Sequence, residues 1–373
     1  MAQLLQYINL LPEGSAFEQV KAHFEARSVE VKEEGPRYML VLKAQAAPNH
    51  AMGQTVGPIL TKDTNTICCV GFPTTMDAGE EPVAAAAAAA GGPFVVSNYL
   101  NGTLIRAYYA SNCWKMSTNS VMNAYESFWG SQMSFGDMVD DCLQEQFSKS
   151  SLAAVLNPRY SYQFMLQHPK DCYNHPTPLL HHIGTFDNTT LQYVHRDEVL
   201  NHPKVVSVKP SQTLQTFAEV QQYVLDSKAL AGIIFHPQGQ ETTVRYKLLH
   251  PAFKTRRALL GNTPDFHLRY LECLAEGSQQ FFLSEFPHML PLAVTVQQAL
   301  LVVIKDVHAL YLEKFVKKNL TVPVLYAYRP ILYALHGLYK QNRQKITGQV
   351  VQGLIQSYHP RKQHFILKSV GLV

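Results

Sequence analysis

The most constraining feature of this sequence is a change in its periodicity close to residue 290. Before that point, short runs of aromatic and β-branched residues are bounded by Gly, Pro, Asn or Asp, as in strands. These runs cover residues 38–42, 66–70, 94–97, 103–109, 162–166, 231–235 and 243–248. Apolar residues at helical spacing cover residues 16–27, 135–146, 213–227 and 265–276.

From Pro291 onward the strand-like runs stop. Helical spacing of apolar residues then continues over residues 292–319, 324–342, 347–358 and 363–370. The first part, with its hairpin-like pair at residues 104–109 and 114–117, predicts the α+β class with antiparallel sheets and inserted helices. We therefore expect an α+β domain over residues 1–290 and an all-helical domain over residues 291–373. Residues 78–92 contain seven consecutive alanines flanked by Pro and Gly-Gly. This composition predicts a disordered Ala-rich insertion.

Composition places the chain among globular proteins, with 46% hydrophobic and 16% charged residues. No run of about 18 or more apolar residues occurs, so no membrane span is expected. The first residues lack the pattern of a secretory signal, and we expect an intracellular protein of the cytoplasm, nucleus or virion. The six cysteines include no Cys-x-x-Cys pair, and no histidine cluster has thiol or acidic partners at ligand spacing. No metal site is expected.

Charge is concentrated at the C-terminal end. Residues 292–373 hold 11 Lys or Arg and two acids, a net +9, which leaves −5 for the rest of the chain. Such polarity is typical of a protein that meets an acidic partner, most often nucleic acid. A solvated basic helical face is the alternative.

Five segments carry the chemistry that the sequence suggests, and they occur in a fixed order. The first is Asn98-Tyr99-Leu100-Asn101-Gly102-Thr103, an Asn-Gly turn followed by an apolar run that contains Arg106. The others are the strand-like run at residues 114–117 with its Ser/Thr-rich turn, Tyr162-Gln163-Phe164-Met165-Leu166, Leu230-Ala231-Gly232-Ile233-Ile234-Phe235 and Val244-Arg245-Tyr246-Lys247-Leu248.

In order and spacing, these segments resemble the motifs of the ATP-dependent RNA ligases, a family of covalent nucleotidyltransferases, over roughly residues 55–275. The resemblance is to the phage and viral type, which also carries a helical C-terminal domain. It implies the nucleotidyltransferase (ligase-like) fold and a pocket for a nucleotide and its phosphates. The pocket candidates that it supplies are Asn101, Gly102, Arg106, Arg245 and Lys247.

Three positions depart from the family's pattern. Tyr99 stands where the lysine nucleophile belongs, Met165 stands in the place of one glutamate and Ala231 in that of another. A phenol forms no lysyl phosphoramidate, and neither Met nor Ala binds a metal or a ribose hydroxyl. No lysine lies between Lys62 and Lys115, so a shifted alignment supplies no nucleophile. No catalytic residue and no cofactor are therefore expected.

The leading interpretation is a catalytically inactive, RNA-ligase-like protein that binds nucleic acid, RNA favoured, or a protein partner, and no membrane. Two alternatives remain open: an active ATP-dependent ligase with a displaced nucleophile such as Lys115, which would use ATP and Mg²⁺, and a viral structural or assembly protein that reuses the fold. Nucleic-acid-binding candidates are the cations Lys254, Arg256, Arg257, Lys314, Lys317, Lys318, Arg343 and Lys345. Lys314, Lys317 and Lys318 are expected to share one helical face.

Overall fold

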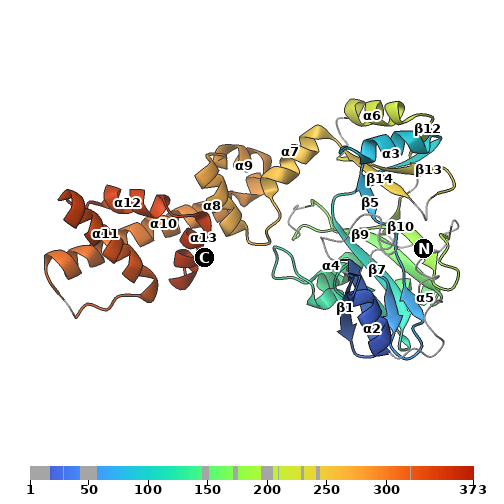
Figure 1. Ribbon diagram of the computed structural model, residues 1–373, viewed down its shortest axis with the longest axis horizontal. Helices are drawn as coiled ribbons and strands as arrows, with labels where there is room; N and C mark the ends of the chain where they lie inside the picture. The colour runs from blue at the N-terminus through green and yellow to red at the C-terminus, as the bar shows by residue number, and fades with distance from the viewer. Residues whose placement is uncertain are drawn as a thin grey trace. The chain divides into compact units, whose positions relative to one another are not determined.

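The computed structural model describes residues 17–27, 29–42, 57–144, 151–170, 175–194, 205–208, 210–227, 231–240, 244–319 and 321–373. The chain divides into two compact units, Met1–Lys254 and Thr255–Val373. Strands and helices mix in the first unit and the second is helical (Figure 1), which confirms the expected α+β class with a C-terminal helical region. Cys172, residue 16, residues 145–146 and residue 243 lie outside the described residues.

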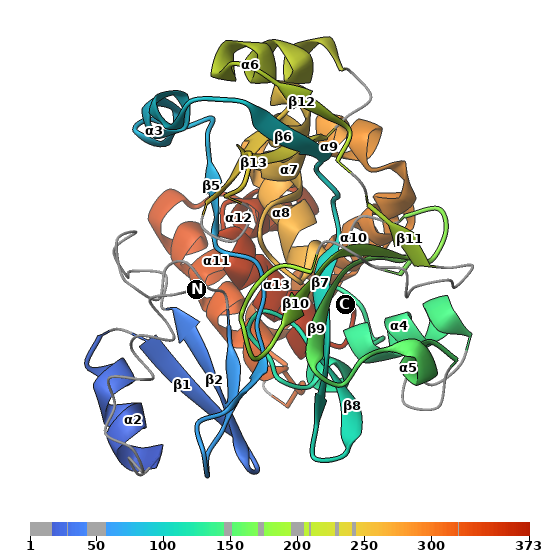
Figure 2. The same ribbon diagram turned by 90° about the vertical axis from the view of Figure 1, so that its right-hand side faces the viewer.

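The first sheet of the N-terminal unit has the order β1-β2-β3-β4, and every neighbouring pair is antiparallel. Helix α2 packs on one face of it, where Val20 and Phe24 meet Val31, Leu40 and Leu60 in an apolar core. Figure 2 shows α2 beside β1 and β2. The bounds are α2 Phe17–Glu25, β1 Val29–Glu34, β2 Arg37–Leu42, β3 Ile59–Thr61 and β4 Ile67–Cys69.

The second sheet has the order β11-β10-β9-β7-β8. Alternate residues of β7 and β9 bury one face against α4, which begins at the capping serine Ser134 and contributes Met138 and Val139 to the core. The bounds are β7 Thr103–Ala110, β8 Cys113–Ser117, η2 Ala124–Glu126, α4 Phe135–Leu143, α5 Ser151–Val155, β9 Tyr160–Gln167, β10 Leu179–Asp187 and β11 Val205–Ser207.

The third sheet has the order β12-β6-β13-β14-β5 and is mixed, because β14 and β5 run parallel. Helices α3 and α6 pack against it (Figure 1), with Val220 and Val224 of α6 in a core with Phe94 and Phe235. The bounds are β5 Thr75–Asp77, α3 Val83–Ala90, β6 Phe94–Asn98, β12 Gln212–Leu214, α6 Phe217–Asp226, β13 Gly232–Pro237 and β14 Arg245–Leu249.

The Ala-rich tract differs from the disordered insertion that its composition suggested. Seven consecutive alanines form most of helix α3, and Ala87 is fully buried in the core of the third sheet. Alanine has the highest helix propensity, and its small side chain lets a helix approach its neighbours closely. Gly91 caps the helix, and Gly92 lies against the backbone of Gln215, where a Cβ atom would collide with the carbonyl oxygen.

The C-terminal unit is built around the long helix α10, which packs with α8, α11, α12 and α13. The bounds are α7 Pro251–Leu260, α8 Phe266–Glu276, α9 Gln279–Glu285, η4 Pro287–Met289, α10 Leu290–Tyr311, the π-helical turn η5 Leu312–Val316, η6 Tyr326–Tyr328, α11 Arg329–Asn342, α12 Gly348–Gln356 and α13 Pro360–Ser369. The unit begins well before the boundary expected near residue 290. The reason is that α8 packs on α10 and α13 and therefore belongs with the helices that follow it.

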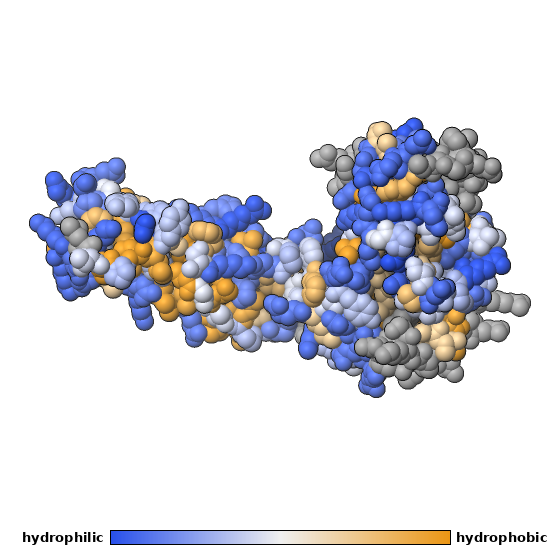
Figure 3. Space-filling view, turned by 90° about the horizontal axis from the view of Figure 1, so that it is seen from below, coloured by the Kyte–Doolittle hydropathy of each residue, from blue (hydrophilic) through white to orange (hydrophobic). Residues whose placement is uncertain are grey.

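By length and composition alone, the helical segment Pro287–Val316 could cross a membrane. The 18-residue stretch used for this test has a mean hydropathy of 1.5, and 28% of that stretch is buried inside the protein. This differs from the sequence expectation, which counted only uninterrupted apolar runs. Core helices of soluble proteins have the same property, and Val296, Val303 and Val307 supply the core of this unit. Figure 3 shows apolar side chains also on the surface of this unit, between hydrophilic ones.

Candidate functional site

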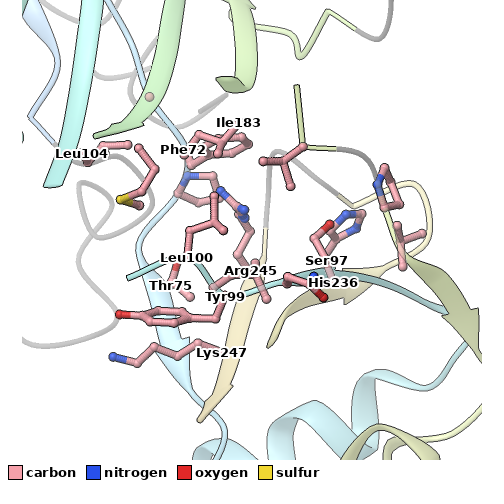
Figure 4. Close-up of a pocket in the computed structure, with 18 of the residues that line it drawn as sticks. Phe72, Thr75, Ser97, Tyr99, Leu100, Leu104, Ile183, His236, Arg245 and Lys247 are labelled. Carbon is pink, nitrogen blue, oxygen red and sulfur yellow. The ribbon is translucent and has the colours of Figure 1, made fainter. Parts of the chain in front are cut away.

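The second and third sheets of the N-terminal unit enclose a cavity of about 380 Å³. The second sheet contributes Leu104, Met165 and Ile183 to its wall, and the third contributes Ile234 and Arg245. Figure 4 shows three of these side chains, Leu104, Ile183 and Arg245, around the space between the sheets. The cavity lies where distant parts of the chain meet, which is a common place for a ligand site.

Four residues singled out by the motifs line this one cavity. Tyr99 directly follows β6, and its backbone N–H donates to the carbonyl of Gly232 at 2.9 Å. Met165 comes from β9, and Arg245 and Lys247 come from β14. Figure 4 shows Tyr99 and Lys247 next to each other, with Arg245 further into the cavity. These four residues, up to 148 positions apart in the sequence, thus meet in one pocket.

Arg245 is the most unusual group of the pocket. Its guanidinium carbon lies 3.6 Å from the ring centroid of Phe72, a cation–π contact. Burial lowers the pKa of Arg245 to about 10, against a small opposing effect of Tyr193. Among the described residues, no carboxylate lies within ion-pair distance of it, so its charge faces the pocket without an acidic partner.

Lys247 lies nearer the edge and has an acidic neighbour. Its Nζ is 3.8 Å from Oδ2 of Asp77, and Oδ1 of the same carboxylate is 3.6 Å from Nζ of Lys254. The parallel pairing of β5 with β14 places Asp77 opposite Lys247. No Asp or Glu is among the described residues that line the cavity, so the wall is apolar and positively charged.

The other pocket candidates lie elsewhere. Asn101 accepts a hydrogen bond at its carbonyl from Gln167, and Gly102 packs against the carbonyl of Leu166, where a Cβ atom would not fit. Neither is among the residues that line the cavity, and the same holds for Ala231, whose carbonyl accepts from the N–H of His250.

Arg106 is fully buried rather than directed into the cavity. Its two terminal nitrogens donate to the carbonyls of Gly57 at 2.5 Å and Thr118 at 2.6 Å. These bonds join β7 to the segment before β3 and to the turn after β8, which makes Arg106 a structural residue. Lys115, on the edge strand β8, is also absent from the lining residues.

The cationic candidates of the C-terminal unit lie at separate positions in it. Arg256 lies over the Phe286 ring at 5.1 Å and donates to the carbonyl of Glu285 at 3.3 Å. Arg257 is in the last turn of α7, Arg343 is the left-handed C-cap of α11, and Lys345 lies in the connection to α12.

The expectation that Lys314, Lys317 and Lys318 share one helical face is wrong. Lys314 lies within the π-helical turn Leu312–Val316, Lys317 caps that turn, and Lys318 has a left-handed φ of 60°. The wider turn and the end of the helix break the i, i+3, i+4 spacing. Lys317 instead forms an ion pair with Glu313 at 2.6 Å.

No cluster of three or more His, Cys, Asp or Glu side chains with metal-binding geometry occurs in the described part of the chain. The cysteines described there, Cys68, Cys69, Cys113, Cys142 and Cys273, are free thiols. Burial raises the pKa of Cys68 to about 11, which keeps this thiol protonated and unreactive at neutral pH.

No family model matches the chain. The chain is similar to the immediate-early protein ICP-46 homolog of invertebrate iridescent virus 6, with 22% identity over an alignment of 289 residues that covers 68% of this chain and 60% of that protein. The match therefore spans less than two thirds of the viral relative.

Among solved structures, the chain is similar to an archaeal ATP-dependent RNA ligase, with 13% identity, a TM-score of 0.43 and coverage of 72% of this chain and 68% of that one. It is also similar to an RNA ligase from Naegleria gruberi, with 11% identity, a TM-score of 0.37 and coverage of 50% and 57%.

Several residues of the pocket were not identified from the sequence. Phe72, Tyr193 and His236 line the cavity from a loop, an irregular segment and β13. Phe72 and Tyr193 are isolated aromatic residues outside the predicted strands, and His236 directly follows the predicted run 231–235, so no spacing rule connects the three. The pairing of β5 with β14, which brings Asp77 to Lys247, likewise leaves no local signal.

Proposed function

We propose that this protein has a nucleotidyltransferase fold of the RNA ligase type, lacks covalent nucleotidyl transfer, and binds nucleic acid, with RNA the favoured ligand. The observation that supports this most is that Tyr99, Met165, Arg245 and Lys247 line one cavity. They come from three of the segments that resemble ligase motifs. A chance resemblance of short segments would give no reason for them to meet.

The chemistry of the lining argues against catalysis. Transfer of a nucleotide through a covalent intermediate requires an amine to attack the α-phosphate and carboxylates to hold a metal that neutralises the developing charge. The described lining supplies a phenol at Tyr99 and a thioether at Met165, and no carboxylate. Arg245 and Lys247 remain, and they suit the binding of a phosphate without its transfer.

The direct test is incubation of the protein with labelled ATP or GTP and Mg²⁺ or Mn²⁺, followed by denaturing electrophoresis. We expect no labelled band from the wild type or from Tyr99→Lys, because one restored amine still lacks carboxylates for the metal. Lys247 is the one lysine among the described residues that line the pocket. A band that is lost in Lys247→Ala but kept in Lys115→Ala would overturn the proposal and assign the nucleophile to Lys247.

Binding is tested separately with labelled RNA and DNA of identical sequence at low and high salt. Tighter binding of RNA, weakened by salt, is the expected result, because phosphate contacts release counterions. Absence of binding to either polymer at low salt would overturn the nucleic-acid part of the proposal and leave the lack of transfer activity standing.

A further inference from the structure

An aromatic cluster lies where the end of α10 meets α11 in the C-terminal unit. The ring of Phe315 stacks on His336, with centroids 4.2 Å apart and an interplanar angle of 16°. Phe315 also meets Tyr333 edge-on at 6.2 Å, and His336 is nearly parallel to Tyr339 at 6.1 Å. Tyr311, which is only 3% exposed, packs against Phe315 on the buried side of the cluster, with ring centroids 5.3 Å apart.

The upper rings of this cluster are open to solvent. Tyr333 is 62% exposed and Tyr339 is 37% exposed, and Tyr326, in the turn before α11, is 78% exposed. Rings of this size are normally buried in a core or in an interface. Here Phe315 and His336 hold the rings of Tyr333 and Tyr339 in place, so these rings are available to a planar ligand at a low cost in side-chain entropy. Tyr326 lies seven positions before Tyr333 in the sequence.

Cations lie near the exposed Tyr333 ring, one in direct contact and others close in sequence. Lys314 Nζ lies 5.5 Å from the ring centroid of Tyr333, and Lys317 is in the same turn of chain. Arg329 and Lys340 lie on α11 one turn before Tyr333 and two turns after it. Two acids are near, and both have partners: Glu313 pairs with Lys317, and Asp306 accepts from Tyr328.

The cluster also coincides with a break in regular helical geometry. The turn Leu312–Val316 is π-helical, and it contains both Lys314 and Phe315. A π-helical turn inserts one extra residue into a helix, and such turns are frequent at functional sites. In this molecule the extra residue lets Phe315 reach His336 while Lys314 reaches Tyr333.

We infer that Tyr326, Tyr333 and the cations around them form a binding platform for single-stranded RNA, on which unpaired bases stack. The inference rests on the proposed nucleic-acid binding and specifies its ligand. Every base has a π-face, and the surrounding cations track the phosphates, so this recognition tolerates any sequence. A duplex hides its base faces and would gain the charge contacts without the stacking.

The test uses the full chain and fluorescence anisotropy with a labelled oligouridylate and a duplex of equal length. The double variant Tyr326→Ala and Tyr333→Ala should bind the single strand about 5- to 100-fold more weakly, the range that base–aromatic stacking produces. The dependence of affinity on salt should stay the same, because no charge is removed. The matched variant Tyr326→Phe and Tyr333→Phe should bind like the wild type.

Phe365→Ala serves as the surface control, because Phe365 is 55% exposed on α13 and outside the cluster. Tyr333→Trp gives a second readout, since its fluorescence should be quenched by the bound single strand. An alanine double variant that binds like the wild type, or equal losses for duplex and single strand, would overturn the platform while nucleic-acid binding itself stands. If the wild type binds no nucleic acid at low salt, both proposals fail.

Discussion

Replacing Arg245 with Met should make the protein more stable and at the same time remove anion binding from the cavity. Arg245 is a half-buried cation with a desolvated guanidinium, and the described residues provide it with an aromatic ring and no carboxylate. A methionine has a similar reach and no charge. Stability and ligand binding are therefore expected to change in opposite directions, which an ordinary destabilising substitution cannot imitate.

The size of the effect follows from the pKa. A fall in the pKa of Arg245 from 12.5 to about 10 corresponds to about 3 kcal/mol against the charged form, as an upper bound. Loss of the contact with Phe72 returns about 1–2 kcal/mol. The net gain of about 1–2 kcal/mol should raise the Tm by about 2–8 °C. Arg245 keeps its proton to a higher pH in the unfolded chain than in the folded protein. The penalty on folding is therefore present at neutral pH and is relieved only as the pH rises through about 10.

Thermal unfolding is measured with and without AMP or pyrophosphate, in the absence of divalent metal. The wild type should be stabilised by the anion, because a ligand that binds only the folded state raises the Tm. Arg245→Met should start at a higher Tm and show no ligand shift, and Arg245→Lys should keep part of the shift. A lower Tm for Arg245→Met would refute the reasoning, because it would mean that the guanidinium has a stabilising partner within the protein.

Three further predictions concern other parts of the molecule. Replacing Lys314, Lys317 and Lys318 together with Ala should weaken binding equally for all RNA sequences and lower the slope of log affinity against log salt by up to about 2, measured by salt titration. Gly184→Ala should lower the free energy of unfolding by about 1–3 kcal/mol in urea denaturation, because the new Cβ would lie 2.8 Å from the Tyr193 ring and press on Phe72. Burial opposes ionisation of Asp265, but hydrogen bonds from Lys368 and from the N–H of Leu268 outweigh it and lower its pKa. Asp265 therefore stabilises the fold above its unfolded pKa and loses this effect as the pH falls through the lowered value. Asp265→Asn keeps the helix cap and should cost about 1 kcal/mol near neutral pH but almost nothing in strong acid, measured by denaturation across pH.

Periodicity gave a good account of the strands and helices that bury one apolar face. The runs around Phe94–Asn98, Thr103–Ala110 and Tyr160–Gln167 were expected within one or two residues, because alternation is strong there. Strand β1 was missed, since Val29–Glu34 places charged residues at four of its six positions. Strand β10 was missed because a bulge near His182 and Gly184 interrupts its alternation.

For the site, the sequence was informative where residues belong to a patterned strand. The resemblance to the ligase motifs indicated Arg245 and Lys247 as pocket residues, and Tyr99 and Met165, at positions of the same motifs, line the cavity with them. The candidates Asn101 and Gly102 are not among the lining residues. The role of Arg106 could not be anticipated, because its partners are backbone carbonyls at Gly57 and Thr118, and carbonyls carry no side-chain signal. The shared face of the three lysines failed for a similar reason, since a π-helical turn has no simple sequence pattern.

The bonds between the first two sheets also bear on how the chain folds as it is synthesised. The first sheet is complete by residue 69, yet several of its polar groups are satisfied by residues made much later. Arg37 donates to the hydroxyl of Tyr108, and Asn188 donates to the carbonyl of Cys68.

The segment just after the first sheet depends on late residues in the same way. The carbonyl of Val70 accepts from Gln163, and its N–H donates to Ser161. A nascent chain that ends before residue 160 therefore leaves these groups without their native partners. We expect the N-terminal strands to stay susceptible to protease until β9 and the turn after β10 have emerged from the ribosome. The first sheet would then be a late product of folding although it is the first to be translated.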